Sequence, residues 1–282
     1  MNPVRSNPMN SSGAARPAMT LVRLAAIALL LSALTTVAAQ SLAALLPSET
    51  IAAVGVRGLA DHQAKLQPFV DEWGRLGLTE ALEDSADEGI DELGALAGVG
   101  FFDLLGDEAW LAVSASNFNP LPAVTVVARV SEAGARALAD MLADAASNDD
   151  SAQSFTEGSI SFTLFDSDED FPAAVALSGN FAALSTNPDT LRGVLRRYQG
   201  ASEPNFTDSV AYASALAPLE PFTVAFTLDY PRVADALAPL AQGMGFDQSV
   251  ARVAKALRTA GAYAGASLLT DGGIESTSLQ VL

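Results

Sequence analysis

The chain has no cysteine among its 282 residues and contains a single histidine. Without cysteine there are no disulfides, no thiol nucleophiles, no thiolate metal sites and no lipid-modified cysteine of the bacterial lipoprotein type. Because His62 stands alone, zinc sites built from histidine and cysteine are excluded as well. These absences remove several classes of enzyme and metalloprotein before any motif is considered.

Basic residues are also scarce: 15 Lys and Arg face 33 Asp and Glu, which gives a formal net charge of −18. Such an acidic surface repels phosphate backbones and anionic lipid headgroups, so nucleic acid is not an expected partner. We interpret the charge as a determinant of solubility in preference to an acidic recognition surface. With 50% hydrophobic residues the chain can bury a substantial core.

The N-terminal region has the pattern of a secretory signal peptide. An apolar run over Leu24–Leu34 follows Arg23, and Val37-Ala38-Ala39 suits signal-peptidase cleavage before Gln40. We therefore expect an exported protein, periplasmic or extracellular, whose residues 1–39 are a signal peptide. Translation could start at Met1 or at Met19, which begins a more ordinary basic leader.

A retained N-terminal anchor is the alternative to cleavage. The apolar run is about half the roughly 20 residues that a membrane-spanning helix needs, but Leu42–Leu46 would extend it if cleavage failed. Contact with a membrane is expected only through that uncleaved segment.

One stretch predicts a complete folding unit. Two apolar runs, Ala173–Leu177 and Phe181–Leu184, flank Gly179-Asn180, which predicts a tight hairpin. Asn187 and Pro188 then form the start of a helix that Gly200 ends, with its apolar residues at helical spacing. Hairpins are likewise expected for Trp110–Ser116 with Ala123–Val130, for residues 155–165, and for residues 263–282.

Hairpins joined by helices predict an α+β fold, a mainly antiparallel sheet with helices packed on one face. A polar break at Ser147–Asp150 suggests two α+β halves, residues 40–146 and 151–282, packed as one globular unit. Residues 49–130 and 221–282 show the same expected order of strand, helices and hairpin. This shared order suggests an internal duplication.

Several short stretches resemble an uncharacterised bacterial family known as domain of unknown function 3352. They are LPSETIAAVGVRGL, the strand entry Gly106-Asp107-Glu108-Ala109-Trp110, the hairpin LSGNFAALST, and a strand ending in TLDYP. The resemblance would cover most of residues 46–282, and it implies an exported envelope protein. It brings no reaction, cofactor or catalytic residue.

The polar motifs favour structural roles. His62 lacks a GxSxG serine to complete a triad, so we interpret it as a surface residue in a first helical turn. Asp166, Asp168 and Asp170 alternate like calcium ligands, but Phe171 and Leu177 replace the required glycine and glutamate, which leaves a solvated loop or a looser divalent site. The arginines of the predicted helix, Arg192, Arg196 and Arg197, are explained by helix electrostatics.

No catalytic, cofactor-binding or metal-binding residue is therefore assigned from the sequence. The leading hypothesis is a non-enzymatic interaction or structural module of the cell envelope, with an unknown envelope protein or an amphiphile as partner. The first alternative is a carrier that holds a lipid or other amphiphile in an apolar cavity between sheet and helices. A carboxylate-based hydrolase is a weaker alternative, because acidic residues are plentiful but no spacing singles out a pair.

Overall fold

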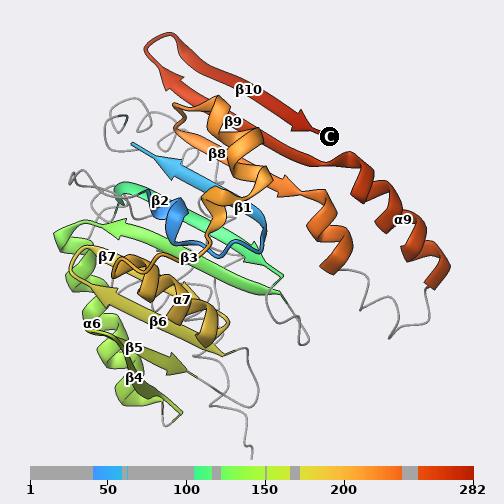
Figure 1. The fold of residues 1–282 in the computed structure, drawn as a ribbon. Coiled ribbons are helices and arrows are strands. Elements are labelled where there is room, and N and C mark those ends of the chain that lie inside the picture. The colour runs from blue at the N-terminus through green and yellow to red at the C-terminus, as the bar shows by residue number, and fades with distance from the viewer. Residues whose placement is uncertain are drawn as a thin grey trace, which may run out of the picture.

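The computed structural model describes residues 41–58, 62, 105–115, 122–149, 151–165, 172–236 and 247–282. Within these ranges the chain forms one 10-stranded sheet in the order β10-β9-β8-β1-β2-β3-β7-β6-β5-β4 (Figure 1). Every neighbouring pair of strands is antiparallel. The α+β class predicted from the sequence is confirmed.

The elements have the following bounds. The strands are β1 (Thr50–Arg57), β2 (Leu105–Ser114), β3 (Ala123–Val130), β4 (Gln153–Glu157), β5 (Ile160–Phe165), β6 (Ala173–Ser178), β7 (Phe181–Ser185), β8 (Val224–Asp229), β9 (Ala262–Thr270) and β10 (Gly273–Val281). The helices are α6 (Glu132–Asn148), α7 (Pro188–Tyr198), α9 (Asp247–Ala260) and the short η1 (Leu42–Leu45), η3 (Phe206–Asp208), η4 (Ala211–Leu216) and η5 (Ala217–Leu219). Residues 230–236 are also helical.

The two stretches with similar sequence order occupy equivalent places in the sheet. β1 and β8 lie side by side as an antiparallel pair, with Val54 opposite Phe226. The hairpin β2–β3 continues the sheet beyond β1, and the hairpin β9–β10 continues it beyond β8. The topology is therefore repeated on both sides of the β1–β8 pair, whatever the origin of the two stretches.

The expected hairpins are present because their turns are chemically suited to them. β6 and β7 meet with Ser178 opposite Phe181, and Gly179 between them has φ +60°, a conformation that glycine adopts without a Cβ penalty. In the helix that follows, α7, the Asn187 side chain accepts hydrogen bonds from the backbone N–H groups of Asp189 and Thr190, as an N-cap residue should. The hairpin between β4 and β5 turns at Gly158 and Ser159, with Glu157 opposite Ile160.

The sheet has two faces, which we call the front face and the back face. The front face, seen in Figure 1, carries η1, α7, η3 and η4. Its core surrounds the fully buried indole of Trp110, which lies within about 6 Å of the rings of Phe206, Tyr212 and Phe222. Gly55 lies opposite Trp110 on β1, and a Cβ there would be 2.6 Å from indole atoms. The indole can rest on the sheet only because that residue is glycine.

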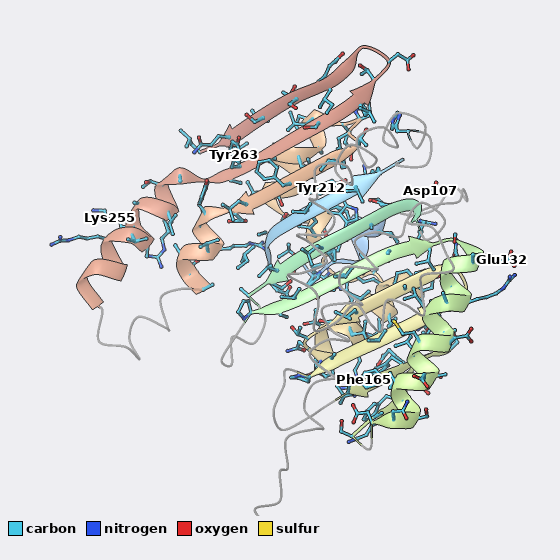
Figure 2. The ribbon with its side chains drawn as sticks, turned by 180° about the vertical axis from the view of Figure 1, so that it is seen from behind. Asp107, Glu132, Phe165, Tyr212, Lys255 and Tyr263 are labelled. Atoms are coloured by element: carbon cyan, nitrogen blue, oxygen red, sulfur yellow. The ribbon has the colours of Figure 1, made fainter. Side chains whose placement is uncertain are left out.

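The back face carries α6, which packs Leu138 and Ala145 against alternate residues of β3, β6 and β7. Figure 2, seen from behind, shows α6 over the end of the sheet that contains β4 to β7. The expectation that the helices would pack on one face is therefore wrong. Strands such as β3 and β7 are buried on both sides, so their apolar runs do not reveal which face a given helix covers.

The segment that follows the predicted cleavage site is part of the core. Leu42, Leu45 and Leu46 of η1 and its C-cap are at most 2% exposed, and they pack on the front face. Arg197 of α7 donates a hydrogen bond to the Leu45 carbonyl, and the Phe206 N–H donates to the Leu46 carbonyl. In this structure Leu42–Leu46 belongs to the globular fold.

Candidate functional site

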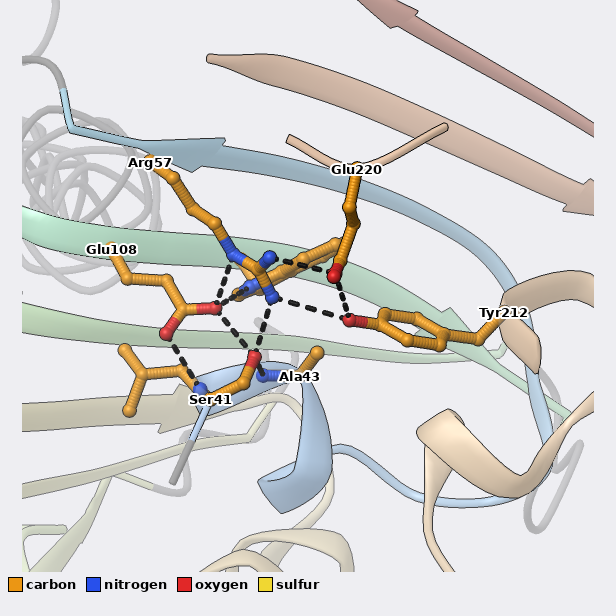
Figure 3. A network of polar contacts seen from close by, with 8 residues as sticks. Ser41, Ala43, Arg57, Glu108, Tyr212 and Glu220 are labelled. Carbon is orange, nitrogen blue, oxygen red and sulfur yellow. Dashed lines mark hydrogen bonds and ion pairs between the residues drawn. The ribbon is translucent and has the colours of Figure 1, made fainter. Parts of the chain in front are cut away.

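A network of polar side chains lies at the edge of the Trp110 core (Figure 3). Its centre is Glu108, which alternation along β2 places on the same face as Trp110. Glu108 Oε1 accepts hydrogen bonds from Ser41 Oγ at 2.7 Å, from Arg57 Nε at 3.0 Å and from Trp110 Nε1 at 2.7 Å. Its other oxygen, Oε2, accepts from the Leu42 N–H at 2.8 Å. This buried carboxylate therefore has a full set of donors.

Arg57, the last residue of β1, connects Glu108 to the C-terminal half of the chain. Its Nη1 donates to Glu220 Oε1 at 2.8 Å, and its Nη2 donates to Ser41 Oγ and to the Tyr212 hydroxyl. The guanidinium also lies 4.6 Å from the centre of the Phe222 ring. Burial alone lowers the pKa of Arg57, but the charge of Glu108 and the hydrogen bonds to Glu220 and Tyr212 outweigh it, so the pKa is raised.

Tyr212 of η4 completes the network. Its hydroxyl accepts from Arg57 and donates to Glu220 Oε1 at 2.9 Å. Burial raises the pKa of Tyr212, and Glu220 adds to this effect while Arg57 opposes it. The phenol is therefore held in its protonated form as a donor to Glu220.

The network has the properties of a structural clamp. It joins the start of η1, β1, β2, η4 and Glu220, the residue that follows η5, through charge-assisted hydrogen bonds. Glu108 and Glu220 are brought together, and Arg57 bridges them, so each carboxylate forms an ion pair with the same guanidinium. The Ser41 hydroxyl is likewise held between Glu108 and Arg57. Nothing in this arrangement activates a nucleophile.

The back face offers a different feature, where apolar side chains are left exposed. Leu111, Val54 and Phe226 lie opposite one another across β2, β1 and β8. The side chains of Val54 and Phe226 remain 40% and 44% exposed. Figure 2 shows α6 over the far end of this face, whereas none of the described helices lies in front of β1 and β8.

A hollow of about 350 Å³ lies on this part of the sheet. The aromatic ring of Phe226 lies close to Gly265, its partner on β9, where a Cβ would be 2.4 Å from the ring. Apolar and aromatic side chains dominate the lining. We call this set the apolar platform; its members are Ala52, Val54, Leu111, Val113, Phe226, Leu228, Tyr230 and Tyr263.

The sequence did not single out the residues of either feature. Arg57 and Glu108 lie far apart in the chain, and only the strand pairing that sets Arg57 opposite Glu108 brings them together. The available signal was weak: a glutamate two residues before a tryptophan, at the start of an apolar run in β2. The apolar platform could not be recognised from the sequence for another reason. An apolar residue in a strand does not indicate whether a helix covers it.

The residues that the sequence did single out are dispersed. His62 lines a second hollow beside Arg57 and Glu220, and its Nδ1 atom has no hydrogen-bond partner among the described residues. Arg192 pairs with Asp189 at 2.7 Å, and Arg196 pairs with Glu203 at 2.8 Å. Arg197 is 8% exposed and its pKa is lowered by burial, against the opposing charges of Glu203 and Glu49. Arg197 lies in the last turn of α7 and also holds η1 in place, because it donates a hydrogen bond to the Leu45 carbonyl.

The aspartates of the proposed calcium-like loop, Asp166, Asp168 and Asp170, lie outside the described residues. Among the residues that are described, no group of three or more acidic or histidine side chains is placed to hold a metal ion. No helix within these same ranges is long and apolar enough to cross a membrane.

Comparison with known proteins adds little to these observations. No protein-family model and no curated protein matches the chain. Two solved structures, crystal forms I and III of TP0453, align with most of it at 10% sequence identity. Form I covers 87% of this chain and 80% of the TP0453 chain with a TM-score of 0.42, and form III covers 86% and 80% with a TM-score of 0.38. A likeness this distant carries no argument about function, so the assignment of a function depends on the described geometry.

Proposed function

We propose that the protein is an exported, non-catalytic binding protein of the cell envelope and that the apolar platform is its binding surface. The ligand is the hydrocarbon part of a lipid or other amphiphile. The signal-peptide pattern supports export, and the structural character of the Arg57 network supports a role without catalysis. The observation that carries the proposal is the hollow over β1 and β8.

Exposed apolar surface of this kind marks interaction sites in soluble proteins. A hollow of about 350 Å³ falls within the range of roughly 300–1,000 Å³ that small-ligand sites occupy. In its lining, the small Ala52 lies between the larger Val113 and Leu228 on the neighbouring strands. This shape and chemistry suit an alkyl chain, whose binding would remove these side chains from water.

The position of the hollow differs from the one expected from the sequence. A carrier was expected to hold its ligand between the sheet and its helices. On the front face that space is filled, since Trp110, Phe206 and Leu191 are fully buried there. We therefore place the ligand on the back face, where the sheet itself forms the floor.

The first test is extraction of the purified exported protein with organic solvent, followed by mass spectrometry of the extract. We expect a lipid or other amphiphile at near-stoichiometric amount. The purified protein, freed of ligand, should also bind dodecyl maltoside, a probe with an uncharged headgroup, below its micellar concentration.

Phe226→Asp should abolish both the extracted lipid and the binding of dodecyl maltoside, because it places a charge at the centre of the platform. Ile274→Asp is the matched control, since Ile274 is 64% exposed on the edge strand β10 and does not line the hollow. Equal binding by the two variants would contradict the proposal. A concentration-dependent dimer that Phe226→Asp abolishes, without any lipid, would instead identify the platform as a protein interface.

A further inference from the structure

A second hollow, of about 500 Å³, opens on the other side of the sheet from the apolar platform. It lies where β1 ends and where the chain approaches β8. Arg57, His62 and Glu220 contribute its polar groups, and Pro221, Phe222 and Leu268 contribute apolar surface. The hollow combines charge with apolar walls, as sites for small polar ligands do.

The charges that the described residues place around this hollow do not balance. Arg57 is the cation shared by two carboxylates, bonding Glu108 at 3.0 Å and Glu220 at 2.8 Å. Glu108 is buried and saturated by four donors. Glu220 is different, because its side chain is 40% exposed and its hydrogen bonds from Arg57 and Tyr212 both go to Oε1. The three groups carry one negative charge in excess, and Glu220 presents it to the hollow.

The apolar walls indicate what kind of cation would fit. One side of the Phe222 ring is covered by the Arg57 guanidinium, and Pro221 and Leu268 extend the apolar lining. A metal ion would gain nothing from such walls, since hard cations require several oxygen ligands. An organic cation can place its charge at the carboxylate and its carbon skeleton against these side chains. The imidazole of His62 forms a further part of the lining.

We infer that this hollow binds a small organic amine, with its ammonium group at the Glu220 carboxylate and its carbon skeleton against Phe222 and Leu268. The net charge of −18 favours the approach of such a cation and disfavours an anion. The site is separate from the apolar platform and does not depend on the function proposed for it.

The test uses three probes of matched size on the native protein: butylamine, 1-butanol and butyrate. Binding is followed by the backbone amide shifts of Gly58 and Thr223, which flank the hollow. We expect saturable shifts in the millimolar range with butylamine at neutral pH, and at least tenfold weaker binding of the alcohol and the acid. Added 0.5 M sodium chloride should weaken the binding of butylamine, because the ammonium–carboxylate attraction is screened.

Glu220→Gln should weaken butylamine binding at least tenfold, since it removes the charge and keeps an oxygen that can accept from Arg57. Glu203→Gln is the matched control, because Glu203 is also a partly exposed acid paired with an arginine but lies at α7, away from the hollow. Circular dichroism and the thermal midpoint would show that both variants fold. The inference is overturned if butyrate or butanol binds as tightly as butylamine, or if Glu220→Gln binds butylamine like the native protein. The three-probe comparison decides the question even if Glu220→Gln fails to fold.

Discussion

At the scale of single residues, Glu108 shows how a buried charge is made compatible with an apolar core. It is 7% exposed and sits beside Trp110, yet its oxygens accept from four groups that come from η1, β1 and β2. An unpaired carboxylate at this place would be strongly unfavourable, whereas a carboxylate with a complete set of donors is tolerated. Its role therefore depends on its neighbours, and its replacement should lower the stability of the fold.

Glu108→Gln should lower the free energy of unfolding by about 3 kcal/mol, because it leaves Arg57 without its buried counter-charge and turns an amide donor toward other donors. Chemical denaturation monitored by fluorescence would measure the loss. Glu132→Gln serves as the control, since Glu132 forms an exposed pair with Arg136 on α6, and its effect should stay within about 0.5 kcal/mol. Equal effects of the two substitutions would show that Glu108 has no special role.

Tyr212 gives the stability a dependence on alkaline pH. Its pKa is raised from the ordinary value of 10.0 in the folded state, chiefly by burial. A raised pKa means that the protonated phenol stabilises the fold at pH values below the pKa of the unfolded chain. This contribution is lost as pH rises through the higher pKa of the folded state.

Tyr212→Phe should therefore flatten the decline of stability above about pH 10, while it lowers stability at pH 7 by about 1 kcal/mol through lost hydrogen bonds. Denaturation midpoints between pH 7 and 11 would test this. Tyr263→Phe is a suitable control, because Tyr263 lies on the back face outside the network. A native-like alkaline decline in Tyr212→Phe would contradict the assignment.

At the scale of elements, η1 is short but central. It is held at its start by Glu108 and at its end by Arg197, and its leucines fill the space between the sheet, α7 and η3. Arg57 and Arg197 thus bind the same segment from opposite halves of the chain. A short helix of this kind has little stability of its own and depends on these contacts.

Leu45→Ala should lower the free energy of unfolding by about 2–5 kcal/mol, as expected for the loss of a fully buried leucine. Leu45 is 2% exposed, whereas Leu282 at the other end of the chain is 92% exposed. Leu282→Ala should consequently change the stability by less than about 0.5 kcal/mol. Similar small effects for both variants would mean that η1 is not part of the core in solution.

The elements that could be predicted from the sequence are those with local causes. Gly179 in its turn, Asn187 at its cap and the alternation around Phe162 each act within a few residues, and the structure contains the hairpins and helix that they predict. It could not be predicted which face of the sheet each helix covers, because strands that are buried on both sides are apolar throughout. The Arg57–Glu108 pair and the apolar platform depend on strand order, which no local pattern specifies.

At the scale of the whole molecule, the sheet separates two kinds of surface. The Arg57 network and the hollow beside Glu220 lie at the front face, and the apolar platform lies on the back face beside α6. Because the platform is formed by β1, β2, β8 and β9, it needs strands from both ends of the chain. Binding at the platform would therefore stabilise the complete sheet in preference to either half.

The pairing of β1 with β8 has a consequence for the time course of folding. Ala53 and Thr227 are partners in the middle of the sheet, yet six strands, β2 to β7, lie between them in the chain. Contacts between such distant residues form slowly, because a long loop must close before they are made. During synthesis from the N-terminus, the seam between β1 and β8 therefore stays open while β2 to β7 are being made. It can close only after β8 has been made, so late completion of the sheet is built into the strand order.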